Sequence, residues 1–143
     1  MLITFYMYLV PNISLLQVYF PELFAPLLRT LLHLTNTLSP RITISYKIRS
    51  LPKEIPFWAT FGLYFAFEPV LCRSPSDPLV WERFGGSFED TTFVFVAHRR
   101  PESRQWTVPI RDQDLLDGIG ARGSDVRKGD ETFELLLLMT MSD

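Results

Sequence analysis

The chain has 143 residues, of which 47% are hydrophobic and 14% aromatic, and its formal net charge is −2. This composition excludes a disordered chain, which has few aromatic residues and a high net charge, and it gives no reason to expect nucleic acid or an anionic membrane as a partner. The length predicts one domain over residues 1–143, and a single cysteine, Cys72, excludes an intrachain disulfide and favours a reducing, cytoplasmic location.

The first twenty residues contain no charged side chain. A membrane span needs about 20 apolar residues, and Pro11, Asn12 and Gln17 break this run into short pieces. A signal peptide needs a basic start and a small-residue cleavage site, and neither is visible. We favour a buried strand over residues 1–10, covered on both faces of a sheet, and keep a membrane anchor over residues 1–20 as the alternative.

Residues 18–49 predict a turn, a helix, a short link and a strand. Leucines and a phenylalanine recur at helical spacing from residue 23 to residue 34, and Pro26 is placed at the first helical position because proline lacks an N–H. Apolar residues then alternate with polar ones over 42–48, as in a strand. A helix that feeds a strand is half of a βαβ crossover, which predicts an α/β layered sheet.

Further elements follow along the chain. Residues 51–64 predict a second helix with an aromatic stripe, and residues 65–73 an irregular edge strand, because a proline interrupts them. Trp81 and Phe84 are expected to fold back onto the core. Residues 91–97 contain strong β-formers throughout and predict a strand.

The segment 98–131 is rich in charge and is predicted to be a solvated insertion with one short helix. His98, Arg99 and Arg100 stand at its start, where they could bind an anionic group, although a solvated strand end is the favoured interpretation. The last segment, 132–141 (TFELLLLMTM), predicts a central strand.

One motif and the two histidines bear on possible chemistry. Gly118–Gly123 matches G-x-G-x-x-G, but a polar helix precedes it and a charged loop follows, so a helix stop is favoured over a phosphate site. The two histidines, His33 and His98, are far apart and pair with no other ligand, so no metal site is predicted. His33 is expected on a solvated helix face.

The order of these segments carries a resemblance. YFPELFAPLL followed by an I-S-Y-K-x-R strand resembles the seven-strand class I methyltransferases, a family that includes many protein-lysine methyltransferases. These enzymes have an Asp-x-x-Tyr turn after their fourth strand, then a helix, a fifth strand, a second helix and a closing β-hairpin. Tyr19 matches the tyrosine of the turn, and Leu16 stands where the acidic residue would be.

The resemblance implies a partial Rossmann-like methyltransferase sheet, with strands equivalent to the fourth to seventh and a charged insertion before the last strand. That last strand, assigned to residues 132–141, would insert antiparallel beside the fifth. The implied substrate site is formed by Tyr19, Phe20, Pro21 and Tyr46.

The implied cofactor is S-adenosyl-L-methionine, and the implied partner is a protein substrate with a lysine acceptor. The glycine loop and the ribose-binding acid of the family would precede the fourth strand, so the chain is expected to represent the C-terminal half of the domain and to be weakly active or inactive alone. The alternative is a non-catalytic α/β interaction module derived from the same fold.

Overall fold

The computed structural model describes residues 5–7, 12–16, 21–83 and 92–141. The strands are β1 (Phe5–Met7), β2 (Asn12–Leu16), β3 (Arg41–Lys47), β4 (Phe65–Pro69), β5 (Leu71–Arg73), β6 (Trp81–Arg83) and β7 (Thr92–Arg99). The helices are α1 (Phe24–Leu34), α2 (Leu51–Tyr64), α3 (Asp112–Leu116) and α4 (Thr132–Met141), with short 3-10 segments η1 (Pro21–Leu23), η2 (Pro101–Gln105) and η3 (Ala121–Gly123).

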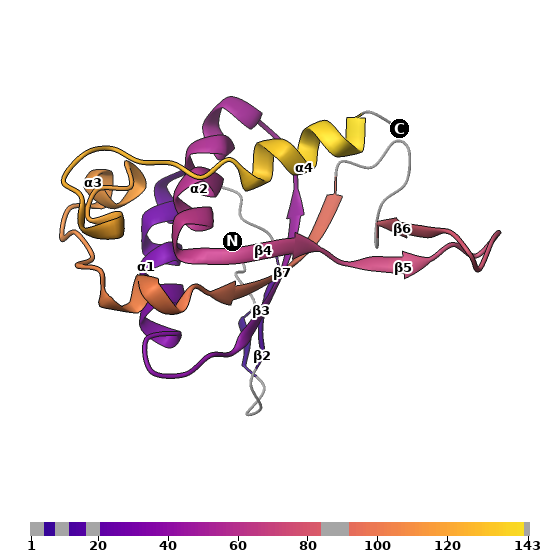
Figure 1. Ribbon diagram of the computed structural model, residues 1–143, viewed down its shortest axis with the longest axis horizontal. Coiled ribbons are helices and arrows are strands. Elements are labelled where there is room, and N and C mark those ends of the chain that lie inside the picture. The colour runs from indigo at the N-terminus through magenta and orange to yellow at the C-terminus, as the bar shows by residue number, and fades with distance from the viewer. Residues whose placement is uncertain (1–4, 8–11, 17–20, 84–91, 142–143) are drawn as a thin grey trace.

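Five strands form one sheet in the order β1-β2-β3-β7-β4, and β5 and β6 form a separate hairpin that projects from the body (Figure 1). The strands β2 and β3 are parallel and are joined through α1, whereas the other neighbours pair antiparallel. The predicted α/β crossover is therefore present. The strand β7 lies between β3 and β4, although it comes later in the chain than both.

The helix α1 forms because its apolar residues return every three or four positions, and it buries Leu28, Leu31 and Leu32. It begins at Phe24, two residues before the predicted start. Pro26 is tolerated there because the first N–H groups of a helix have no intrahelical acceptor.

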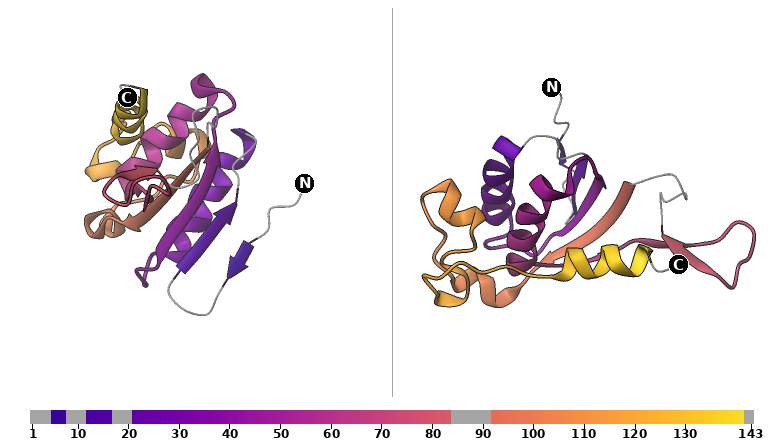
Figure 2. Two further views of the ribbon diagram at one scale, coloured as in Figure 1. Left: turned by 90° about the vertical axis from the view of Figure 1, so that its right-hand side faces the viewer. Right: turned by 90° about the horizontal axis from the view of Figure 1, so that it is seen from above.

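The sheet has one apolar face. The register pairs Ile42 with Ala97, Ile44 with Phe95 and Tyr46 with Phe93, and all six side chains are buried. The helices α1 and α2 lie over this face (Figure 2). The opposite face carries side chains such as those of Ser45, Glu68 and His98, of which the last two are exposed. Such alternation is typical of a sheet covered on one side.

Aromatic rings fill the space between the sheet and the helices. Trp58 of α2 stacks on Phe133 of α4 with 5.1 Å between the ring centroids, and it meets Tyr46 and Phe95 edge-on at 5.0 and 5.2 Å. Aromatic pairs at these separations contribute about 0.5–1.5 kcal/mol each beyond their buried area. The rings thus fix α2 and α4 to the middle of the sheet.

The charge-rich segment after β7 packs against the body through a few apolar residues. Leu115 of α3 and Ala121 of η3 are fully buried, and α3 lies beside α1 and α2. Arg29 of α1 forms an ion pair with Asp112 of α3 at 2.9 Å. The short helix predicted in this segment is confirmed.

The structure corrects the expected end of the sheet. Residues 132–141 form the helix α4, so the predicted last strand is wrong, and β7 is the strand that inserts antiparallel beside β3. An apolar run without period-two alternation suits either a helix or a strand. As a helix, the segment places Phe133 on the ring of Trp58.

Other expectations are revised near the N-terminus and around Pro69. Where one strand was expected over residues 1–10, the described residues form the antiparallel pair β1 and β2, and β2 is the strand parallel to β3. The predicted strand 65–73 is divided at Pro69 between β4, at the edge of the sheet as predicted, and β5 of the hairpin. Trp81 does not fold back onto the core, because it is 60% exposed on the hairpin. Phe84 lies outside the described residues.

Candidate functional site

The residues that the resemblance marks as a substrate site are described only in part. Tyr19 and Phe20 lie outside the described residues, so their role stays a prediction. Pro21 is exposed and begins η1, directly before α1. Tyr46 is 1% exposed on the buried face of the sheet. Pro21 and Tyr46 are therefore the two that the structure places, one at the surface and one in the core.

Tyr46 connects β3 to the start of α2. Its hydroxyl donates a hydrogen bond to the carboxylate of Glu54, which also accepts from the backbone N–H groups of Arg49 at 3.2 Å and Ser50 at 3.1 Å. Burial, followed by the hydrogen bond to Glu54, raises the pKa of the Tyr46 phenol. In this structure the hydroxyl is satisfied inside the core and does not face an open site.

The carboxyl ends of β2 and β3 nevertheless meet at one edge of the sheet, since Leu16 pairs with Ser45. Lys47, the last residue of β3, is exposed there, as expected for a strand end. Tyr19 follows Leu16 by three positions in the sequence. Open α/β sheets bind ligands at this kind of edge.

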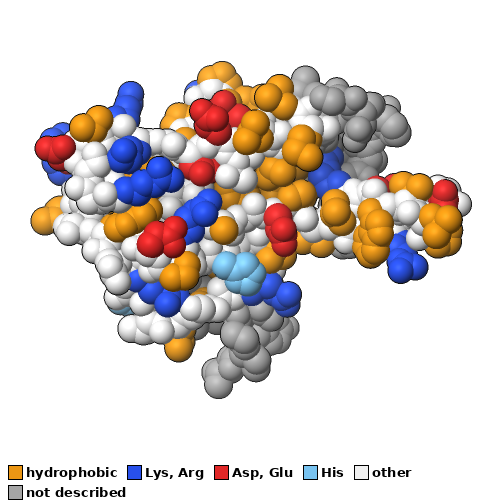
Figure 3. Space-filling view, viewed as in Figure 1, with side chains coloured by type: hydrophobic (Ala, Val, Ile, Leu, Met, Phe, Trp, Pro, Cys, Tyr) orange, Lys and Arg blue, Asp and Glu red, His pale blue; other side chains and the backbone are white. Residues whose placement is uncertain are grey.

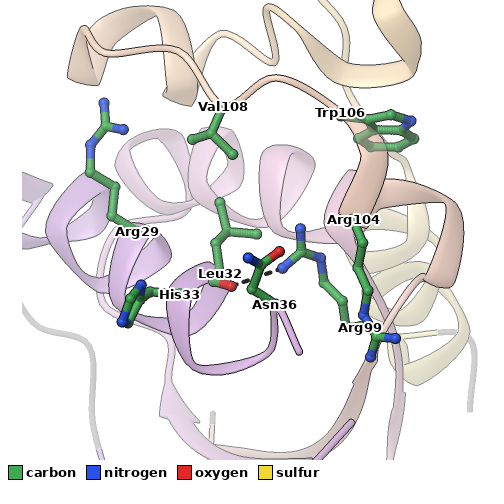
Figure 4. A pocket seen from close by; sticks show the side chains of 8 residues that line it. All are labelled: Arg29, Leu32, His33, Asn36, Arg99, Arg104, Trp106 and Val108. Carbon is green, nitrogen blue, oxygen red and sulfur yellow. Dashed lines mark hydrogen bonds between the residues drawn. The ribbon is translucent and has the colours of Figure 1, made fainter. Parts of the chain in front are cut away.

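A cavity of about 420 Å³ lies at the other end of the sheet (Figure 4). We call it the Arg99 cavity. It is formed where the end of α1, the end of β7 and the segment around η2 come together. Its lining residues are Arg29, Leu32, His33, Asn36, Arg99, Arg104, Trp106 and Val108.

Arg99 is the most buried charge of this cavity, with 5% of its surface exposed. Its Nη1 donates to the carbonyl oxygen of Leu32 and to Oγ1 of Thr35, both at 3.0 Å. Its Nε donates to Oγ of Ser103 at 2.6 Å, and Nη2 donates to the carbonyl oxygen of Ser103 at 3.1 Å. Every one of these acceptors is uncharged.

Arg29 bounds the cavity on the side of α3. Its guanidinium donates to Asp112 at 2.9 Å and to the carbonyl oxygens of Pro109 at 2.6 Å and Ile110 at 2.7 Å. These bonds hold the segment before α3 against α1.

Arg104 bounds the other side. It donates to the carbonyl oxygens of Thr35 at 3.3 Å and Leu38 at 3.2 Å and to the hydroxyl of Ser39. In this way η2 is tied to the turn that follows α1.

The cavity is electropositive. Among the described residues, three arginines and one carboxylate, Asp112, gather around it, and no described carboxylate pairs with Arg99 or Arg104. Burial, and next the charge of Arg104, lower the pKa of the Arg99 guanidinium. A buried cation surrounded by neutral acceptors can stabilise an anion that reaches it.

Arg99 was not predicted as buried, although the sequence contains the signal. Phe93, Phe95 and Ala97 alternate along β7, and Arg99 continues this series onto the core face. His98 points to the open face and is exposed. The favoured interpretation of a solvated strand end thus holds for His98 and is wrong for Arg99. His33 is exposed on α1, as predicted.

The glycine-rich stretch 118–123 follows α3 and precedes no helix that could receive a phosphate. Its three glycines have positive φ angles of 73°, 88° and 70°, and the backbone turns back so that Lys128 N–H bonds to the carbonyl oxygen of Asp117 at 3.0 Å. Positive φ angles of this kind favour glycine. The stretch ends a helix, as the sequence indicated.

In the described part of the chain, no group of three or more His, Cys, Asp or Glu side chains could hold a metal ion. None of the described helices is both long enough and apolar enough to cross a bilayer. Comparison of the chain with protein-family models, with curated proteins and with solved structures gave no match.

Proposed function

We propose that this chain carries the acceptor-side half of an S-adenosylmethionine-dependent methyltransferase domain, directed at a protein lysine. The observation that supports this most is the position of β7. In the resembled family the last strand inserts antiparallel beside the fifth, and β7 inserts antiparallel between β3 and β4. In this proposal β2, β3, β4 and β7 are equivalent to the fourth, fifth, sixth and seventh strands.

The connection between the strands also supports the proposal. The parallel strands β2 and β3 are joined through α1, and α2 joins β3 to β4, which is the order of elements in the resembled family. Tyr19 then falls just after β2, at the position of the family's tyrosine. Its neighbours Phe20 and Pro21 and the exposed Lys47 would border the acceptor at the same edge.

The chemistry assigned to these residues is binding and orientation of the lysine. Aromatic rings exclude water and align the amine, which are the requirements of methyl transfer that protein side chains can meet. When bound, S-adenosylmethionine supplies the methyl group. The described residues do not fit that cofactor, because the one glycine-rich stretch ends a helix at Gly118 and no strand delivers it. We expect the chain alone to be inactive.

The test is nuclear magnetic resonance titration of the labelled chain with N-acetyl-lysine methylamide and, separately, with S-adenosylhomocysteine. We expect the lysine probe to shift the resonances of Tyr19, Phe20 and Lys47, and the matched probe with norleucine in place of lysine to shift them at least tenfold less. Tyr19→Ala should remove the shifts, and Leu79→Ala, on the distant hairpin, should keep them.

Absent or scattered shifts with the lysine probe would overturn the acceptor site. Micromolar binding of S-adenosylhomocysteine by this chain alone would overturn the conclusion that the residues of this chain do not form the cofactor site.

A second function is an α/β interaction module. It is favoured by the projecting β5–β6 hairpin, where Leu79 is 89% and Trp81 60% exposed (Figure 3). Exposed apolar side chains that gather on one surface mark binding sites. Sedimentation measurements test the module: self-association supports it, and a monomer at high concentration counts against it. The lysine probe tests the acceptor site separately.

A further inference from the structure

The Arg99 cavity has a property that the proposed methyl transfer does not use. A guanidinium carries five N–H donors, and the described residues accept four bonds from that of Arg99 without offering a carboxylate. Buried charges in proteins are normally paired with an opposite charge, because desolvation of an isolated charge is costly. Arg104 increases the imbalance, since it also lacks an ion pair among the described residues.

We propose that the Arg99 cavity binds the phosphate group of a small phosphomonoester. Arg99 and Asn36 contact the phosphate, and Trp106 and Val108 contact the organic part. Figure 4 shows the Arg99 guanidinium entering the centre of the cavity with the Asn36 side chain beside it, and Trp106 and Val108 on the opposite wall. The site lies at the end of the sheet away from Lys47 and is independent of the proposed acceptor site.

The size and lining of the cavity favour a phosphomonoester over a bare ion. Its volume of about 420 Å³ falls within the range of roughly 300–1,000 Å³ that is typical of small-molecule sites. A bare phosphate has no apolar part for Leu32, Trp106 and Val108 to contact. One of the five N–H groups of Arg99, on Nη2, has no acceptor among the described residues, and a phosphate oxygen can accept a charge-assisted hydrogen bond from it.

Tyr64 supplies an independent observation. It is fully buried, and its hydroxyl has no hydrogen-bond partner among the described residues. The Arg99 guanidinium carbon lies 5.7 Å from the centre of its ring, and the Trp106 ring centroid lies 5.3 Å from it. Two residues that line the cavity therefore pack on a buried tyrosine whose hydroxyl has no described partner, and buried polar atoms of this kind are uncommon in folded proteins.

The experiment is isothermal titration calorimetry of the full chain with phenyl phosphate and with inorganic phosphate, at pH 7.5 and with the ionic strength matched by sodium chloride. We expect saturable binding of phenyl phosphate at least tenfold tighter than that of inorganic phosphate. Trp106→Leu should reduce this difference to less than threefold. No saturable binding of either compound overturns the proposal. Equal affinities overturn the phosphomonoester as the ligand, because Trp106 would then not contact an organic part, and would indicate a site for free phosphate.

A variant that supplies the missing negative charge tests the mechanism. Asn36 is exposed, so Asn36→Asp should fold normally and place a carboxylate beside Arg99. We expect it to weaken phenyl phosphate binding at least tenfold and to raise the thermal unfolding midpoint in the absence of ligand.

Thr37→Asp is the matched control, because it adds the same charge one residue away, outside the lining of the cavity. It should change the affinity less than threefold. An Asn36→Asp variant that binds as tightly as the parent chain would contradict the placement of the phosphate. Equal losses in both variants would show that only the net charge acts, and would overturn the site as well.

Discussion

Single residues in this protein connect elements through polar groups that a sequence pattern does not reveal. Glu54 is 5% exposed, yet it is a carboxylate. Three donors stabilise this buried carboxylate: the Tyr46 hydroxyl and the backbone N–H groups of Arg49 and Ser50. Periodicity places Tyr46 on the core face correctly. It cannot show that Glu54, one turn into α2, accepts the hydrogen bond of the Tyr46 hydroxyl.

Removal of the Tyr46 hydroxyl should therefore destabilise the chain. We expect Tyr46→Phe to lower the free energy of unfolding by about 1–3 kcal/mol, because a buried carboxylate loses one of its donors. Urea denaturation followed by circular dichroism measures this. Thr43→Val, on the half-buried opposite face of the same strand, should stay within about 0.5 kcal/mol of the parent. A neutral Tyr46→Phe would contradict the hydrogen bond.

Asp117 gives the chain a defined response to acid. Its hydrogen bond from Arg127, at 2.6 Å, is the main cause of a lowered pKa in the folded state. A lowered carboxyl pKa adds stability that is complete above the unfolded value, 3.8, and is lost as the pH falls through the folded value.

The difference in unfolding free energy between the parent chain and Arg127→Gln should accordingly be constant near neutral pH and should decrease as the pH falls below 3.8 and through the lower folded pKa of Asp117. Chemical denaturation in a series of buffers provides the measurement. Because the Arg127 side chain is 75% exposed, the difference should also shrink in 1 M sodium chloride, where charges are screened within about 3 Å. A difference that persists in acid would exclude Asp117 as its origin.

At the scale of elements, the helices and strands that alternate clearly in sequence were predictable. The helix α1 and the strand β3 follow from apolar spacing, and β7 follows from its run of strong β-forming residues. The last segment was not predictable, because four consecutive leucines fit both the helical period and the strand period. It is packed as a helix around the stack of Phe133 on Trp58, and Leu136 and Leu137 also lie against the core. That stack joins residues 75 positions apart and so lies beyond any local pattern.

The dependence of α4 on that contact leads to a test. Phe133→Ala should lower the free energy of unfolding by about 3–5 kcal/mol, the usual cost of removing a buried phenylalanine. Met139→Ala on the same helix should cost less than about 0.5 kcal/mol, because Met139 is 68% exposed. Thermal unfolding of both variants measures the contrast. Similar losses would mean that the helix is held by its whole apolar surface and not by Phe133.

The candidate sites differ in how far the sequence reveals them. The acceptor edge was predicted from Tyr19 and its neighbours through a resemblance, and it stays a prediction. The Arg99 cavity was missed because its residues come from three separated segments, the end of α1, the end of β7 and the η2 region. The alternation that ends in Arg99 points to burial of that residue, but only the folded chain brings Asn36 and Trp106 to it.

At the scale of the whole molecule, the strands should differ strongly in how readily they open. The strand β7 has a neighbour on both sides and lies in the centre of the core, whereas β5 and β6, among the described strands, pair with each other alone. Amide exchange is slowest where opening requires the whole domain to unfold. We expect β7 to exchange most slowly and the β5–β6 hairpin fastest, as measured by exchange and mass spectrometry. Equal protection of the two would contradict the sheet order.

The late arrival of β7 in the chain has a consequence for how the protein is made. Both strands that flank β7 are synthesised before it, so a growing chain presents the edges of β3 and β4 until residue 99 has left the ribosome. During this interval a strand from another nascent chain could take the same place, and such exposed edges are the usual start of aggregation. A pause in synthesis after β4 has left the ribosome but before β7 has left it should therefore lower the yield of folded protein more than a pause after β7 has left it.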